Sequence, residues 1–148
     1  MGLDMFLYKK VYVGANYEHM GIKVNISITN AKGERIKVNP EKIVYIVEDF
    51  AYWRKANHIH KWFVDNIQGG KDDCGNYKLA GCRLLELVDK CKIVREHPDK
   101  ASELLPTQEG FFFGSNEYDE DYFNEIHNTI EQLENVDPDD VYIYHASW

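Results

Sequence analysis

"AYWRKANHIHKWFVDN", residues 51–66, is a basic and aromatic stretch in a chain whose formal net charge is -8. Its hydrophobic and aromatic residues recur at the helical period of 3.6, at positions 52, 53, 56, 59, 60, 63, 64 and 67. The stretch therefore predicts a helix with one side in the core and the other in solvent.

The two sides of this helix differ in chemistry when each residue is placed at about 100° from the last. The predicted core side holds Trp53, Ala56, His60, Phe63, Val64 and Ile67. The predicted solvent side holds Arg54, Lys55, His58, Lys61 and Trp62, with Asn57 on the border. Cations, an amide and an indole together suit an anionic group attached to a flat ring. We therefore predict a small, anionic, nucleotide-like ligand on this side; the alternative is that the long cationic stems cover apolar surface and Trp62 packs on a loop or a second subunit.

A second helix signal precedes this stretch. Asn39 suits an N-cap and Pro40 the first helical position. Apolar residues at 43, 46, 47 and 50 continue the helical period, but their stripe lies about 110° from that of the following segment. A helix kinked near Phe50 and Ala51 is predicted. A strand over 43–48 is the alternative, since "IVYIV" also suits a strand.

The rest of the chain mixes strand and helix patterns. Strands are expected at 3–13, 22–30, 110–114 and 141–148. In the strand at 22–30, Ile22, Val24, Ile26 and Ile28 are expected to point inward, and a turn at 30–34 should lead into a short strand that ends near Val38. The strand at 110–114 is expected to be covered on both faces. A loop is expected at 68–76, helices at 80–96 and 116–135, and helical turns within 97–106. The pattern predicts one α+β domain over 1–148, with a small, mainly antiparallel sheet packed with three long helices; the strand order stays open.

Charge is unevenly distributed along the chain. Residues 1–100 hold all 17 Lys and Arg against 13 acids, a balance of +4, and residues 101–148 hold 12 acids and neither Lys nor Arg, a balance of -12. Duplex nucleic acid is excluded as a predicted partner, because phosphate binding requires a basic stripe. The acidic third suits a basic protein partner or imitation of a nucleic acid, and a solvated helix face is the plain alternative.

Sequence motifs give no catalytic residue, metal site or cofactor. The three cysteines, at 74, 82 and 91, form neither a CxxC pair nor a zinc pattern, and a reducing cytoplasm is expected. His58 and His60 point about 200° apart on a helix, and His60 is expected in the core. HExxH, GxSxG and phosphate-loop motifs do not occur. No secretory signal or apolar run of about 20 residues is found, so no membrane association is predicted.

The segment "GSNEYDEDYF", residues 114–123, marks the start of the last predicted helix. Ser115 or Asn116 is the expected N-cap, with Asp119 closing a pair that resembles a capping box. Ser115 and Tyr118 are candidates for a pocket rim. The acids at 117, 119, 120 and 121 lack the ligand spacing of an EF-hand and suit a solvated helix start.

The pieces "MGLDM", "YWRKAN", "IHKWFVDN", "DDC" and "ELLPTQEGFFFGSNEYDEDYF" resemble a family of small proteins encoded by tailed bacteriophages. The family has no assigned reaction, so the resemblance implies a setting, the cytoplasm of an infected bacterium, and an accessory role. Such proteins often blunt host defence by holding a nucleotide signal or masking a host protein.

Three functions follow as hypotheses. The first is a protein that sequesters a nucleotide-type immune messenger without cleaving it. The second is an inhibitor that binds a host protein through acidic residues 117–140. The third is a hydrolase with His58 or His60 as general base. A homo-oligomer stays open in each case.

Overall fold

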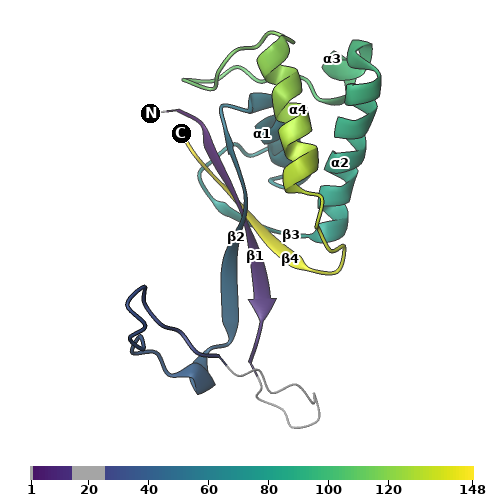
Figure 1. Ribbon diagram of the computed structural model, residues 1–148. Helices are drawn as coiled ribbons and strands as arrows, with labels where there is room; N and C mark the ends of the chain where they lie inside the picture. The colour runs from purple at the N-terminus through teal and green to yellow at the C-terminus, as the bar shows by residue number, and fades with distance from the viewer. Residues whose placement is uncertain (1, 15–25) are drawn as a thin grey trace.

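The computed structural model describes residues 2–14 and 26–148, which form an antiparallel sheet covered by helices on one face (Figure 1). The strands are β1 (Asp4–Tyr12), β2 (Tyr45–Arg54), β3 (Asn76–Ala80) and β4 (Val141–Ser147). Their order across the sheet is β2-β1-β4-β3, and every neighbouring pair is antiparallel. The α+β prediction is confirmed.

The described residues also form four α-helices and two 3-10 turns. They are η2 (Pro40–Lys42), α1 (Asn57–Asn66), α2 (Gly81–Glu96), η3 (Pro98–Lys100), α3 (Ala101–Leu104) and α4 (Glu120–Gln132). The predictions of a helix at 80–96 and of helical turns within 97–106 are confirmed. In the described residues, no helix combines the length and apolar character that a membrane crossing needs.

The core lies between the sheet and the helices. Alternate residues of the strands point toward the helices and are fully buried, among them Leu7 of β1 and Tyr144 of β4. The ring of Phe63 from α1 stacks on Tyr144 with 3.8 Å between ring centres. Trp53 Nε1 of β2 donates a hydrogen bond to Thr129 Oγ1 of α4 at 2.9 Å. These contacts fix α1 and α4 against one sheet face.

The kinked helix predicted over the segment before residue 57 is wrong, and the strand alternative is confirmed and extends to Arg54. The residues of β2 pair with β1 from Tyr45 to Arg54, with a bulge opposite Leu7 and Tyr8. Branched and aromatic residues fit a pleated surface, and ladder hydrogen bonds with β1 override the local helical period. Asn39 and Pro40 do start a helical turn, but it is the short η2.

Two further strand predictions fail in the described residues. Residues 22–25 lie outside the described part, and after them a single bridge joins Thr29 and Arg35 around the predicted turn. Ile28 is exposed rather than inward, and no strand ends near Val38. The turn itself is confirmed, because Asn30 Oδ1 accepts hydrogen bonds from the backbone of the next residues. Local side-chain bonds therefore shape this segment.

Residues 110–114 form a turn, so the strand predicted there is wrong. Phe112 has a φ of 60° and Gly114 a φ of 100°, values that break the strand pleat. Phe113 is buried, whereas Phe111 is 77% and Phe112 51% exposed, so the expected cover on both faces is also wrong.

The last helix is shorter than predicted. It begins at Glu120 because Asp119, rather than Ser115 or Asn116, is the N-cap: its side chain accepts a hydrogen bond from Tyr122 N at 3.1 Å. Tyr122 and Ile126 of α4, and Leu133 directly after it, are buried and form an apolar stripe against the core.

Candidate functional site

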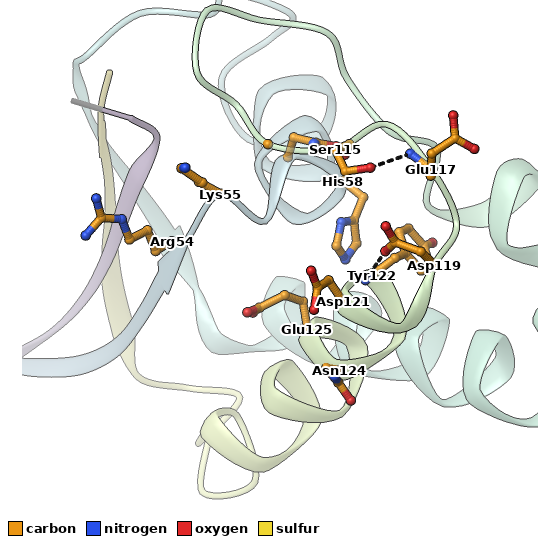
Figure 2. A pocket seen from close by; sticks show the side chains of 12 residues that line it. Arg54, Lys55, His58, Ser115, Glu117, Asp119, Asp121, Tyr122, Asn124 and Glu125 are labelled. Atoms are coloured by element: carbon orange, nitrogen blue, oxygen red, sulfur yellow. Dashed lines mark hydrogen bonds between the residues drawn. The ribbon is translucent and has the colours of Figure 1, made fainter.

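A pocket of about 290 Å³ lies where the end of β2 meets the start of α1 and the first turns of α4 (Figure 2). Five of the predicted site residues line it, namely Arg54, Lys55, Asn57, His58 and Ser115. The sequence placed the first four on one helix, whereas the structure places two at the end of a strand and two in the first turn of α1. A tight corner between the two elements brings them together.

Lys55 makes this corner. Its φ is 57°, in the left-handed region that costs a residue with a Cβ about 1–2 kcal/mol. Its N–H donates to Leu3 O at 2.8 Å, which ends β2. A Cβ added to Gly114 would lie 2.9 Å from Lys55 O, so glycine allows the 110–114 turn to approach the corner closely. Strain and close packing are thus concentrated beside the pocket.

Asn57 fastens the pocket wall rather than facing solvent. Its side chain is buried, and Nδ2 donates to Ser115 O at 2.8 Å and Phe113 O at 3.3 Å. Its Oδ1 accepts a hydrogen bond from Gln108 N at 3.1 Å. Both donors of the amide are therefore engaged in holding the 108–115 segment against α1.

His58 is the most informative residue of the pocket. The prediction that it faces solvent is wrong, since it is 4% exposed, and its ring packs on Tyr122 with 4.1 Å between ring centres. Its Nε2 is buried without a hydrogen-bond partner in the described part of the chain. Burial lowers the pKa of His58 to about 3, so the ring is neutral at pH 7. Figure 2 shows the ring reaching from α1 toward the residues of α4 that line the pocket.

The pocket has a cationic side and an acidic side. Arg54 ends β2 and Lys55 follows it, and four acids line the same pocket from the 114–119 segment and α4 (Figure 2). Those acids are Glu117, Asp119, Asp121 and Glu125. Asp119 is engaged as N-cap, and Glu125 Oε2 accepts a hydrogen bond from Asn128. Arg54 is exposed. Its Nε lies 3.9 Å from Asp4 Oδ1, which is too long for a hydrogen bond. Within the described residues, most of its N–H donors are therefore left for a ligand.

Lys61, Trp62 and Tyr118 do not line this pocket. Trp62 was predicted on the solvent side and is 4% exposed, so that prediction is wrong: α1 is covered by the sheet on one side and by the segment around Leu104 and Pro106 on the other. Lys61 Nζ pairs with Asp65 at 3.0 Å. Both residues, together with His58, line a second cavity of about 290 Å³. Tyr118 packs edge-on against Tyr122 outside the pocket.

The core side predicted for residues 53–67 is largely correct, although Trp53 belongs to β2 and Ala56 precedes α1. Trp53, Ala56, His60, Phe63 and Val64 are buried, while Ile67 is half-buried. His60 Nδ1 lies 2.7 Å from the Tyr144 hydroxyl, and Nε2 lies 2.9 Å from Asp72 Oδ1. Burial lowers the pKa of His60, against the opposing effect of Asp72, and raises that of Tyr144. The neutral ring thus donates from Nε2 to Asp72 and accepts at Nδ1 from Tyr144.

This His60 network supports the pocket from behind. Gln108 Nε2 donates to Asp72 Oδ2 at 2.7 Å, and the backbone of Gln108 donates to Asn57. The chain of hydrogen bonds therefore runs from the sheet to the pocket wall, with both nitrogens of His60 engaged.

The acids Asp121 and Glu125 are pocket residues that the sequence did not identify. Their spacing of four residues puts them on one face of a helix, but that pattern is also typical of a solvated face. Only the packing of α4 across the β2–α1 corner makes them part of a site.

Within residues 2–14 and 26–148, no group of three or more His, Cys, Asp or Glu side chains is arranged to hold a metal ion. Comparison with known proteins finds no matching family model, no similar curated protein and no similar solved structure.

Proposed function

We propose that the chain binds a small nucleotide-type molecule in the pocket around His58 and holds it without cleaving it. The observation that carries the proposal is the buried Nε2 of His58. A buried polar atom without a partner costs about 1–3 kcal/mol, and a ligand that hydrogen-bonds to it recovers that energy. Native proteins keep few such groups, and each calls for an explanation.

The two charged sides restrict the ligand. A phosphate or carboxylate suits Arg54 and Lys55, which can give charge-assisted hydrogen bonds. The N–H groups of a nucleobase suit Asp121 and Glu125, which accept hydrogen bonds. A polyphosphate is disfavoured, because the acidic side would repel it. A volume of about 290 Å³ is at the lower end of small-molecule sites, so a ligand the size of a mononucleotide is favoured over a larger one.

Binding without hydrolysis is supported by the state of the two histidines. A general base works best with a pKa near the working pH, and the pKa of His58 at about 3 makes it a weak base. His60 is fully buried with both ring nitrogens engaged. The hydrolase hypothesis therefore lacks a suitable base among these two residues.

The resemblance to phage proteins supplies the biological part of the proposal. In the cytoplasm of an infected bacterium, an accessory protein with this pocket would withdraw a nucleotide signal from the host's defence. The inference is by analogy of setting, and the chemistry of the pocket supports only the class of ligand.

A thermal-shift screen tests the proposal. The chain is mixed with nucleoside monophosphates, cyclic nucleotides and ADP-ribose derivatives. A ligand at about 100 times its Kd should stabilise the fold by about 2.7 kcal/mol, and chromatography should recover it intact. Absence of a shift with every nucleotide would refute the proposal, and a cleaved product would refute binding without hydrolysis.

A matched pair of variants locates the site. Arg54→Ala should weaken binding about 10- to 150-fold, because a hydrogen bond to a charged group contributes about 1.5–3 kcal/mol. Lys61→Ala removes a cation from the same stretch but from the other cavity, so it should leave binding unchanged. Equal losses in both variants would contradict this placement.

A second candidate function, binding of a basic host protein, is favoured by the acids of residues 101–148. Of these, only Asp140 forms an ion pair within the described residues, with Lys9 at 2.7 Å. Glu120, Glu131 and Glu134 are exposed and add to the surface available to a basic partner. Pull-down from host lysate should recover a protein at low salt and lose it near 1 M, where the Debye length is about 3 Å. Recovery of nothing at low salt would exclude this function.

A further inference from the structure

The sheet face away from the helices carries a group of aromatic rings that the nucleotide pocket does not use. Its members lie at outward positions and are neighbours across the strands: Phe6 is opposite Tyr52 and His145, and Tyr12 is opposite Tyr45. We name this surface the open face; its rings are Phe6, Tyr8, Tyr12, Tyr45, Tyr52 and His145. The helices α1, α2 and α4 lie on the other side of the sheet (Figure 1).

These rings are accessible and close together. Tyr12, Tyr45 and Tyr52 are 45–50% exposed. The rings of Phe6 and Tyr8 are nearly parallel, 3° apart, with 6.2 Å between their centres. Phe6 also lies 5.3 Å from Tyr52 and 6.0 Å from His145. Several adjacent and partly exposed rings offer places for more than one planar group to stack.

The charges of the open face differ from those of the whole chain. Three cations lie at its outward register positions, Lys10, Arg54 and Lys78, against two carboxylates, Asp4 and Asp49, which gives a balance of +1 in a chain of -8. Arg54 also lines the pocket around His58, so only Lys10 and Lys78 are cations of the open face alone. Lys10 Nζ lies 4.0 Å from the ring centre of Tyr45. Asp4 accepts a hydrogen bond from the Tyr52 hydroxyl, which partly offsets the negative charge that this carboxylate presents to an anion. The helix α4, which carries several acids, lies on the other side of the sheet (Figure 1).

Another strand or a second copy fits this surface less well. Gln132 both donates to Tyr52 O and accepts from Tyr52 N, so the free edge of β2 is blocked there against strand addition. Protein interfaces also exclude charged residues from their centres, whereas here cations lie among the rings.

We propose that the open face binds single-stranded nucleic acid, with bases stacked on Phe6, Tyr8 and Tyr52 and the backbone phosphates near Lys10 and Lys78. Unpaired bases stack on exposed rings of a four-stranded sheet, and stacking tolerates any sequence because every base has a flat face. A duplex hides those faces, so it is not bound by this surface. The site shares only Arg54 with the pocket around His58, and none of its rings lines that pocket.

Fluorescence anisotropy with labelled oligonucleotides tests this proposal. A single-stranded RNA, the DNA of the same sequence and their duplex forms are titrated with the whole chain at two salt concentrations. Single strands should bind, more weakly at higher salt, and duplexes at least about 10-fold more weakly than single strands. Comparing RNA with DNA shows which sugar is preferred.

Variants outside the nucleotide pocket keep the two proposals separate. Tyr8→Ala should weaken single-strand binding about 5- to 150-fold, and Tyr8→Phe, which keeps the ring, should retain it. Phe111→Ala, which removes an exposed ring elsewhere, should have no effect. Lys78→Glu should weaken binding, whereas Lys92→Glu, on the exposed side of α2, should not.

Several outcomes would overturn the proposal. These are no binding of single strands at low salt, equal binding of duplexes, or equal effects of Lys78→Glu and Lys92→Glu, which would indicate unspecific attraction. A dimer in sedimentation that Tyr8→Ala dissociates would identify a second copy of the chain as the occupant instead. If no nucleotide binds in the thermal-shift screen, the proposal of single-strand binding still stands, because Tyr8 and Lys78 do not line that pocket.

Discussion

Replacing His58 by phenylalanine should make the fold less sensitive to acid. The pKa of His58 is lowered from 6.5 to about 3 by burial, so between these values the unfolded ring binds a proton that the folded ring does not. The free energy of unfolding therefore has its full value above pH 6.5, as far as His58 is concerned. It falls as the pH falls from 6.5 toward 3, because protonation of the ring favours the unfolded chain. The variant has no such group.

The size of the effect follows from the same values. Each pH unit below 6.5 corresponds to about 1.4 kcal/mol until the folded pKa is reached. Between pH 7 and pH 4.5, the wild type should therefore lose about 2.5 kcal/mol more than His58→Phe. At pH 7, the variant should be more stable by about 1–3 kcal/mol, because it removes a buried nitrogen that has no partner.

Urea unfolding followed by tryptophan fluorescence at both pH values measures the difference. His127→Gln, which removes an exposed histidine from α4, is the control and should follow the wild type. A loss of stability that is equal, within about 1 kcal/mol, in wild type and His58→Phe would refute the assignment of His58 as a buried neutral ring. The same variant should also fail to bind the nucleotide that stabilises the wild type.

Three further substitutions probe the corner that builds the pocket. Trp53→Ala should destabilise the fold by about 3–5 kcal/mol in urea unfolding, because the indole is 1% exposed and bonded to Thr129; a change below about 1 kcal/mol would contradict the packing of β2 on α4. Lys55→Gly should raise stability by about 0.5–1 kcal/mol, because glycine adopts the left-handed backbone without strain, and should weaken nucleotide binding; Lys55→Ala should weaken binding without the gain in stability. Gly114→Ala should lower the melting temperature, because its φ of 100° and its 2.9 Å approach to Lys55 O leave no room for a Cβ; an unchanged melting temperature would show that the turn can move away.

The elements that the sequence predicted well are those whose pattern has one physical interpretation. The helix at 81–96 has a stripe of buried residues, Leu84, Leu87, Val88, Cys91 and Val94, with no competing strand pattern. The segment 43–56 has apolar residues that fit both periods, and its pairing with β1, about 40 residues away, decided the outcome. Long-range pairing of this kind cannot be seen in a local period.

The helix faces show a second limit. Placing residues about 100° apart around a helix axis separates the two sides only if one side alone is buried. The helix α1 is instead buried between the sheet and the segment around Pro106. Trp62 and His58, opposite the predicted core side, are therefore buried as well. By contrast, Arg54 and Lys55 are exposed as expected, because the chain leaves the sheet at that point. Apart from Ser115, the pocket residues that were predicted are close together in sequence, at positions 54–58.

The structure explains why an acidic chain carries a basic, aromatic segment at 51–66. Most of its aromatic residues belong to the core, since Trp53, Trp62 and Phe63 are buried, and Lys61 is paired with Asp65. The remaining cations, Arg54 and Lys55, lie opposite the acids of α4 across the pocket without forming an ion pair with them in the described residues. Direct ion pairs would close the site, whereas separated charges leave room for a ligand with groups of both kinds. The separation of the two signs by a pocket, with a neutral histidine between them, is therefore the feature on which the proposal of a nucleotide-type ligand rests.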